Sequence, residues 1–139
     1  MKYIRGYFDG SCEPVNPGGT AKYGFVILNE EDCVLFSDHG LVGEGEGMTN
    51  NVGEYVGLIE CLSYLLENHK DDLLEVYGDS KMVINMTGGT WGKKKPHKNH
   101  PHLAPLLAEA REVFDKLENC SLHWIPREQN SLADFMSKL

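Results

Sequence analysis

Four acidic residues stand at places where one predicted element of the chain passes into the next. They are Asp9 in YFDGS, Glu54 in TNNVGE, Asp79 in VYGDS and Asp134 in NSLAD. If folding gathers these carboxylates away from lysine and arginine, they need a divalent cation, because clustered and dehydrated negative charges are otherwise unstable. The four acids together therefore predict a metal site.

Each of these positions also has an ordinary structural explanation. Asp9-Gly10 is a common turn dipeptide, and Asn51–Glu54 fits a capping box at the start of a helix. Asp79 fits a helix N-cap, and Ser131–Asp134 fits a weaker capping pair. For any one position alone the structural explanation is favoured, whereas the four sequence contexts taken together favour the metal site.

The sequence contexts of the acids resemble those of a known family. The chain resembles type 1 ribonuclease H in four segments that keep the family's order and spacing: FDGSCEPVNPGGTAKYGFVI, TNNVGEYVGLIECL, VYGDSKMVI and REQNSLADFMSKL. The resemblance extends from about Tyr3 to Leu139. It implies a single ribonuclease H domain over residues 1–139, with the α/β fold of that family.

Hydrophobic patterns predict the elements that must position the acids. Strands are expected at 2–9, 20–28, 33–42, 73–79 and 121–126, and helices at 51–68, 80–88, 103–117 and 130–139. This order predicts a mixed five-stranded sheet, three antiparallel strands plus two parallel ones, flanked by helices. Asp9 and Asp79 would lie at or near the C-terminal ends of strands, where ligands gather in open α/β sheets. Glu54 and Asp134 would reach them from the first turns of two helices.

The resemblance implies an endoribonuclease that hydrolyses the RNA strand of RNA–DNA hybrids and leaves 5′-phosphate and 3′-hydroxyl ends. It implies catalysis with two Mg²⁺ ions, for which Mn²⁺ would substitute at least in part, since both prefer oxygen ligands. Asp9 would bridge the two ions, Glu54 and Asp79 would complete one site, and Asp134 the other. The short PREQN loop and the end at Leu139 suggest double-stranded RNA as a second substrate.

Selectivity for RNA requires polar groups that read the 2′-hydroxyl from the minor groove. The positions that match substrate-binding ones in the family are the backbone of Gly10, Ser11 and Cys12, the side chains of Asn16, Thr49, Asn50, Asn51, Lys81 and Asn130, and the basic protrusion with Trp91, Lys93, Lys94 and Lys95. Thr49 would contact a phosphate of the DNA strand, and Lys81 a phosphate or a base edge. Helix capping is an equally good explanation of Asn50 and Asn51.

The loop before the last acid departs from the commonest family pattern. Many members carry a mobile histidine there, whereas this chain has the short PREQN with Arg127, as in a subgroup of archaeal and bacterial members. An arginine cannot act as a general base near neutral pH, so a catalytic role of Arg127 would be electrostatic. Glu128 could tune metal exchange, but a plain surface role is favoured for it.

The net charge of −8 is unusual for a protein that binds nucleic acid. The charge is segregated, however, because residues 88–102 hold four lysines and three histidines without one acid. An acid-free patch beside Trp91 favours contact with a phosphate backbone. His97, His100 and His102 are expected to add charge to this patch and not to bind metal.

Composition and sequence patterns narrow the range of alternative functions and locations. No long apolar run or signal peptide is apparent, and the four cysteines show no zinc-binding spacing, so we expect a cytoplasmic monomer that does not bind a membrane. A non-catalytic hybrid-binding module of the same fold remains the main alternative, although the presence of all four acids argues against it. A transposase or integrase core lacks the TNN-x-x-E pattern and the terminal AD-bearing helix.

Overall fold

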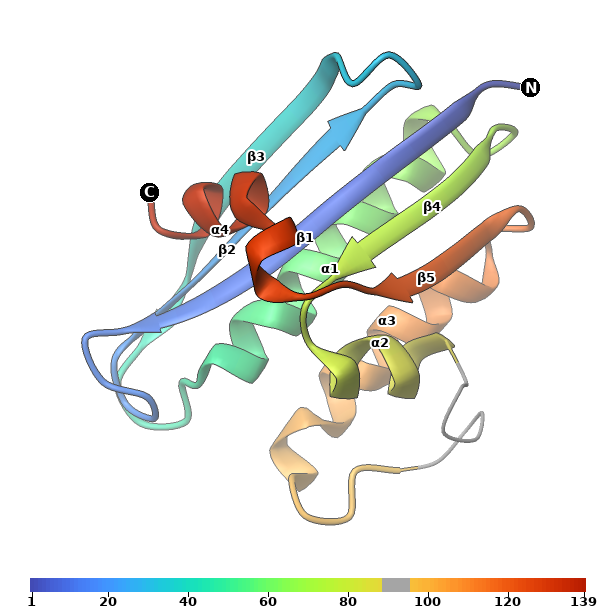
Figure 1. Cartoon of the computed structure of the whole chain (residues 1–139). Coiled ribbons are helices and arrows are strands. Elements are labelled where there is room, and N and C mark those ends of the chain that lie inside the picture. Colours follow the sequence, from blue (N-terminus) through green and yellow to red (C-terminus); the bar gives the residue numbers. More distant parts are fainter. Residues whose placement is uncertain (89–95) are drawn as a thin grey trace.

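One mixed five-stranded sheet forms the centre of the computed structural model, which describes residues 1–88 and 96–139 (Figure 1). Its strands are β1 (Tyr3–Glu13), β2 (Thr20–Leu28), β3 (Val34–Glu44), β4 (Leu73–Gly78) and β5 (Cys120–Trp124), in the order β3-β2-β1-β4-β5. β1, β2 and β3 pair antiparallel, while β4 pairs parallel with both β1 and β5. The predicted sheet of three antiparallel and two parallel strands is confirmed.

Helices cover both faces of this sheet (Figure 1). They are α1 (Asn50–Asn68), α2 (Lys81–Gly88), α3 (Ala104–Asp115) and α4 (Ser131–Ser137), with short 3₁₀ turns at Pro101–Leu103 and Arg127–Gln129. α1 packs on β1 and β2 with α3 beside it, and α4 crosses the opposite face of β1 and β2. The predicted helices are confirmed with ends shifted by a few residues.

The main core lies between the sheet and the layer of α1, α2 and α3. Side chains that point to this face alternate along each strand, as Ile4 and Phe8 do in β1 and Leu74 and Val76 in β4. The apolar stripe of α1 fills the space above them, and its largest fully buried members are Tyr55, Leu58, Leu62 and Leu65. Burial of this stripe fixes the rotation of α1 about its axis, and with it the direction of Glu54.

β1 is longer than predicted, which changes the setting of Asp9. The parallel pairing with β4 ends at Tyr7, but β1 continues to Glu13 because β2 pairs with it from Arg5 to Glu13. Asp9 therefore lies inside a strand, just beyond the point where the neighbouring strand ends. Asp79 follows the last residue of β4 directly, as predicted.

His97 differs from its predicted role as accessory charge. It is only 8% exposed, and its Nε2 lies 2.6 Å from the hydroxyl of Tyr55, a fully buried residue of α1. Burial, followed by the neighbouring charges of His100, Arg111 and His102, lowers the pKa of His97. Its neutral form is therefore favoured, and it anchors the segment before α3 to the core.

Four of the residues expected to bind substrate cannot be placed. Trp91, Lys93, Lys94 and Lys95 lie outside the described ranges. Within those ranges, no helix has the length and apolar character that a membrane crossing requires.

Replacing Tyr55 by Phe should lower the free energy of unfolding by about 1 kcal/mol, because the buried hydrogen bond to His97 is lost while the ring remains. Urea denaturation at pH 7.5 measures this change. Tyr23→Phe is the matched control, since no partner of the Tyr23 hydroxyl is found among the described residues and the ring is only partly buried. Equal effects of the two variants would show that the Tyr55–His97 contact contributes nothing.

Candidate active site

Three of the four predicted acids converge. One carboxylate oxygen each from Asp9 on β1, Glu54 on α1 and Asp79 after β4 lie within 4.8 Å of one another. Asp9 is 4% exposed and Glu54 3% exposed, and Oε2 of Glu54 has no hydrogen-bond partner in the described part of the chain. The three segments are far apart in the sequence, so only the pairing of β1 with β4 and the packing of α1 on β1 bring them together.

The capping explanations of Asp79 and Asn51–Glu54 are wrong. Thr49 is the N-cap of α1 and accepts a hydrogen bond from the backbone N–H three residues later (3.2 Å). Ser80 caps the start of α2 in the same way: its hydroxyl accepts a hydrogen bond from the backbone N–H of Val83 at 3.2 Å. Because these two hydroxyls satisfy the helix ends, the carboxylates of Glu54 and Asp79 are free to face each other.

Asn130 is a buried residue that holds the Asp79 carboxylate in place by a hydrogen bond. Its side-chain NH₂ donates to the carbonyl oxygen of Phe8 (2.9 Å) and to Oδ2 of Asp79 (3.2 Å). The Asn130 side chain is only 1% exposed, which puts it beneath the carboxylates and away from the surface where a substrate would lie. The amide is thus suited to orient a metal ligand, as outer partners of metal sites commonly do.

Burial makes the negative charges of this cluster costly. Loss of hydration raises the pKa of Asp9 to about 6, with the charge of Asp79 acting in the same direction. Burial, followed by a hydrogen bond with Asp9 and the charges of Asp9 and Asp79, raises the pKa of Glu54 well above its usual value. The backbone of Gly10 forms a hydrogen bond that opposes both shifts.

The close packing of α1 on β1 depends on residues without a side chain. A Cβ atom on Gly10 would lie 2.1 Å from the backbone nitrogen of Glu54, and one on Gly57 would lie 2.8 Å from the carbonyl oxygen of Asp9. No larger residue fits at Gly10, because the obstacle is backbone and cannot turn aside. Gly10 is a predicted substrate contact. In the structure, its lack of a side chain lets Asp9 and Glu54 come close together.

Asp134 occupies a different environment from the other three acids. Its side chain is 31% exposed, and Oδ1 lies 3.5 Å from Nζ of Lys138 and 3.9 Å from an Nη of Arg127. The condition that the carboxylates lie away from lysine and arginine is therefore not met at Asp134. Asp134 nevertheless lies close enough to Asp9 for a hydrogen bond between them to raise the pKa of Asp9.

The position of Asp134 depends on how α4 packs against β1 and β2. The Ser11 hydroxyl donates to the carbonyl oxygen of Ser137 at 2.8 Å, which ties the end of α4 to β1. Gly24 on β2 lets the helix backbone come close, since a Cβ there would lie 2.5 Å from the nitrogen of Ser137. The side chain of Ser11, a predicted substrate-binding residue, thus helps to hold α4 against the sheet.

A cleft of about 290 Å³ lies over the carboxylates. Its lining includes ten of the predicted site residues and two others: Asp9, Gly10, Ser11, Cys12, Asn16, Asn50, Glu54, Asp79, Arg127 and Asp134, with Glu13 and Lys138 in addition. Lys138 bridges Asp134 and Glu13, whose Oε1 is 3.8 Å from Nζ. The spacing of four residues between Asp134 and Lys138 on a helix could have identified this lysine from the sequence.

Other predicted substrate residues lie at or beyond the rim. The Asn16 side-chain NH₂ donates to Oδ1 of Asn50 (2.9 Å), so the two form one polar edge of the cleft. Thr49, Asn51 and Lys81 do not line the cleft. Glu128 is exposed and does not line it either, in keeping with the surface role favoured for it.

These residues fit a divalent cation. The trio offers only carboxylate oxygens, the donors that Mg²⁺ and Mn²⁺ prefer, and one of these oxygens is buried without a partner. The pKa values of Asp9 and Glu54 are raised by burial, and no positive charge among the described residues balances their negative charges. Binding of a cation would offset that deficit of positive charge and would give Glu54 Oε2 a partner.

Gly10→Ala should destabilise the fold by about 3 kcal/mol, because the added methyl group meets the backbone of α1 and must push the helix away. Stabilisation by Mg²⁺ should be lost as well, since Asp9 and Glu54 would separate. Thermal unfolding with and without Mg²⁺ tests both effects. Gly88→Ala is the control, because the nearest atom to its added methyl group is at an ordinary 3.5 Å.

Without metal, the protein should become less stable as pH rises from about 4 to 6. The pKa of Asp9 is higher in the folded state, so the unfolded chain releases this proton first, and the destabilisation is complete above about pH 6. In EDTA at pH 7.5, Asp9→Asn should therefore be more stable than wild type by about 1 to 3 kcal/mol. Urea denaturation measures this, with the exposed Asp71→Asn as control; a less stable Asp9→Asn protein would contradict the electrostatic account.

Sequence comparison identifies relatives over nearly the whole chain. The profile of the reverse transcriptase-like family matches residues 7–139. Ribonuclease HI of Halobacterium salinarum is 32% identical over 134 residues, which make up 96% of this chain and 62% of that protein. A Mycobacterium tuberculosis protein named as bifunctional is 32% identical over 120 residues, 86% of this chain but 30% of its own length. The chain thus spans less than two thirds of each of these relatives.

Solved structures agree in fold over nearly the whole chain. The ribonuclease H1 of Halobacterium salinarum superposes with a TM-score of 0.80 at 28% identity, covering 96% of this chain and 93% of that one. LC11-RNase H1, isolated from compost, gives a TM-score of 0.79 at 31% identity, covering 98% and 93%. LC11-RNase H1 has also been solved in complex with an RNA/DNA hybrid, with a TM-score of 0.78 at 30% identity and coverage of 96% and 92%. By profile, identity and fold, the chain belongs to the type 1 ribonuclease H family.

Proposed function

We propose that this protein is a divalent-metal-dependent endonuclease that hydrolyses the RNA strand of RNA–DNA hybrids. The observation that carries the proposal is the trio of Asp9, Glu54 and Asp79, converging within 4.8 Å at the floor of an open cleft with Asp134 beside it. The similarity to LC11-RNase H1, whose structure contains an RNA/DNA hybrid, supports the substrate class. Family resemblance adds the products, 5′-phosphate and 3′-hydroxyl ends.

The four carboxylates would provide ligands for two cations. Asp9 lies close both to Glu54 and Asp79 and to Asp134, so it would serve both sites, as the resemblance implies. Two such cations, when bound, supply an activated water and charge stabilisation for the leaving oxygen of a phosphodiester. Mg²⁺ is the expected ion, and Mn²⁺ should substitute because the donor set is all oxygen.

The remaining residues of the cleft keep these ligands in position and supply positive charge. Asn130 fixes one oxygen of Asp79, and the Gly10 backbone favours the ionised forms of Asp9 and Glu54. Arg127 stays charged at all working pH values, so its guanidinium would stabilise charge on the phosphate. Its present partner, Asp134, would exchange that contact for a cation, since the two groups are 3.9 Å apart and the Arg127 side chain is 73% exposed.

Discrimination of RNA would come from the polar edge of the cleft. Asn16 and Asn50 present amide groups there, and the backbone of Gly10 to Cys12 forms the adjoining wall. Such groups can read a 2′-hydroxyl, which both RNA–DNA hybrids and double-stranded RNA possess. We therefore propose the hybrid as substrate and keep double-stranded RNA as a second substrate for the experiment to decide.

Further elements of the proposal come from the sequence alone. The protrusion with Trp91, Lys93, Lys94 and Lys95 would grip the hybrid backbone, which would offset the net charge of −8 near the duplex. We further propose that the chain acts as a monomeric single domain in the cytoplasm. The PREQN loop with Arg127 would place it in the subgroup that lacks the mobile histidine.

Cleavage of matched RNA–DNA, RNA–RNA and DNA–DNA duplexes tests the proposal. Wild type with Mg²⁺ should cut the RNA strand of the hybrid, and Asp9→Asn should lower the rate by at least about 1,000-fold, because the residue that serves both metal sites is lost. Asp71→Asn should cleave like wild type. Product ends are read by radiolabelling, which distinguishes 5′-phosphate from 5′-hydroxyl.

The same experiment decides against the proposal if wild type cleaves no duplex with Mg²⁺ or Mn²⁺. Retained binding of the hybrid without cleavage would then make the protein a non-catalytic hybrid-binding module. Equal activity of wild type and Asp9→Asn would show that the cleavage does not come from this site.

A further inference from the structure

Lys81 and Trp124 form a pair immediately beside Asp79, outside the cleft. Lys81 is the first residue of α2, two positions after Asp79, and Trp124 is the last residue of β5, opposite Gly78 in the parallel pairing. The Lys81 ammonium lies 4.5 Å from the centre of the Trp124 ring. The indole N–H donates to the carbonyl oxygen of Asp79 at 3.1 Å, so the ring is fixed to the segment that carries the metal ligand.

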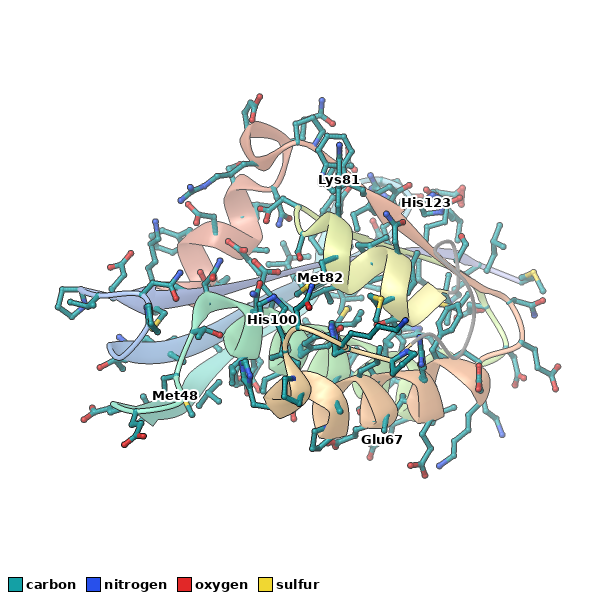
Figure 2. All side chains as sticks on the ribbon, turned by 90° about the horizontal axis from the view of Figure 1, so that it is seen from below. Met48, Glu67, Lys81, Met82, His100 and His123 are labelled. Atoms are coloured by element: carbon teal, nitrogen blue, oxygen red, sulfur yellow. The ribbon has the colours of Figure 1, made fainter. Side chains whose placement is uncertain are left out.

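Fold stability does not explain this pair. Trp124 keeps 42% of its surface exposed, which is a poor use of a large aromatic side chain if packing is its purpose. Lys81 is also exposed, and a cation in the first turn of a helix faces the positive end of the helix dipole. Figure 2 shows Lys81 rising from the start of α2, on the side of the molecule opposite Glu67.

Lys81 also differs from the two cations of the cleft. Arg127 lies by Asp134, and Lys138 lies between Asp134 and Glu13. Lys81 has no acidic partner in the described part of the chain, and its ammonium group lies against the ring of Trp124. An aromatic face holds an ammonium group without neutralising it, so the open side of Lys81 keeps its charge and its N–H donors.

We propose that Lys81, positioned by the ring of Trp124, binds a backbone phosphate of the nucleic acid next to the scissile one. This inference rests on the proposed function and names the contact that would hold the duplex beside Asp79. A phosphate fits better than a base edge because a lysine is a compact point charge, and phosphates occur at every step of the backbone whatever the sequence. Trp124 is a positioning residue, since it acts through Lys81.

Binding of a labelled RNA–DNA hybrid at several salt concentrations tests the proposal. An Asp9→Asn background with Mg²⁺ prevents cleavage during the titration. Lys81→Ala should weaken binding about threefold to tenfold at low salt and reduce the slope of log K against log salt by about 1, the loss of one phosphate contact. Lys116→Ala, which removes an exposed lysine near the start of β5, should change neither quantity.

Two substitutions of Trp124 separate the ring from the indole N–H. Trp124→Phe keeps an aromatic face but loses the hydrogen bond to Asp79, whereas Trp124→Leu loses both. Trp124→Leu should weaken hybrid binding about twofold to fivefold and Trp124→Phe much less. In the Lys81→Ala background, Trp124→Leu should have no further effect, because the group that it positions is already gone.

Activity in the otherwise wild-type enzyme supplies a second measure. Lys81→Ala and Trp124→Leu should raise KM at moderate salt and leave kcat within about twofold, as expected for a contact made before and during the reaction alike. A fall in kcat with unchanged KM would mean that Trp124 acts on Asp79 itself, and would overturn the proposal. Thermal unfolding of each variant verifies that it is folded.

The outcomes separate this inference from the proposed function. If wild type cleaves the hybrid but Lys81→Ala leaves the salt slope unchanged, the phosphate contact is wrong and the nuclease function stands. If Trp124→Leu weakens binding equally with and without Lys81, the positioning role of the ring is wrong. If hybrid is neither cleaved by wild type nor bound by the Asp9→Asn protein with Lys81 intact, both proposals fail.

Discussion

The close contact between α1 and β1 is the constraint on which the site depends. At Gly10 and Gly57 the helix and the strand meet without an intervening side chain, and Cβ atoms there would lie 2.1 Å and 2.8 Å from backbone atoms. This contact brings Glu54 over Asp9. The parallel pairing of β4 with β1 then ends at Tyr7 and leaves room for Asp79 to meet them from the other side. Backbone geometry, more than side-chain packing, therefore determines the spacing of the three carboxylates.

At neutral pH this spacing has an electrostatic cost, which a bound cation would remove. Burial raises the pKa of Asp9 and of Glu54, and Glu54 Oε2 has no protein partner in the described chain. Asn130 stabilises the arrangement through Asp79 without adding charge. The fold thus spends stability on a cluster of negative charge, as is usual for sites whose purpose is binding and not packing.

Positive charge is distributed locally in a chain that is acidic overall. Arg127 and Lys138 lie beside Asp134, which is more exposed than the buried Asp9 and Glu54. Lys81 lies on the other flank, held by Trp124 and without an acidic partner among the described residues. A polyanionic substrate would therefore meet cations on both sides of the carboxylates, so the net charge of −8 does not describe the surface that it contacts.

The sequence by itself determined the five strands, their mixed pairing and the four acids, because strand and helix periodicities are local and the family motifs keep their spacing. It did not determine that Thr49 and Ser80, and not Asn51 and Asp79, cap the helices, since several polar residues near each helix start can make the same bond. Only the tertiary structure placed Asp9 inside a longer strand, buried His97 against Tyr55, and brought Trp124 to Lys81. The physical reason is that burial, and contacts between segments distant in sequence, depend on how the elements pack, and no local pattern carries that information.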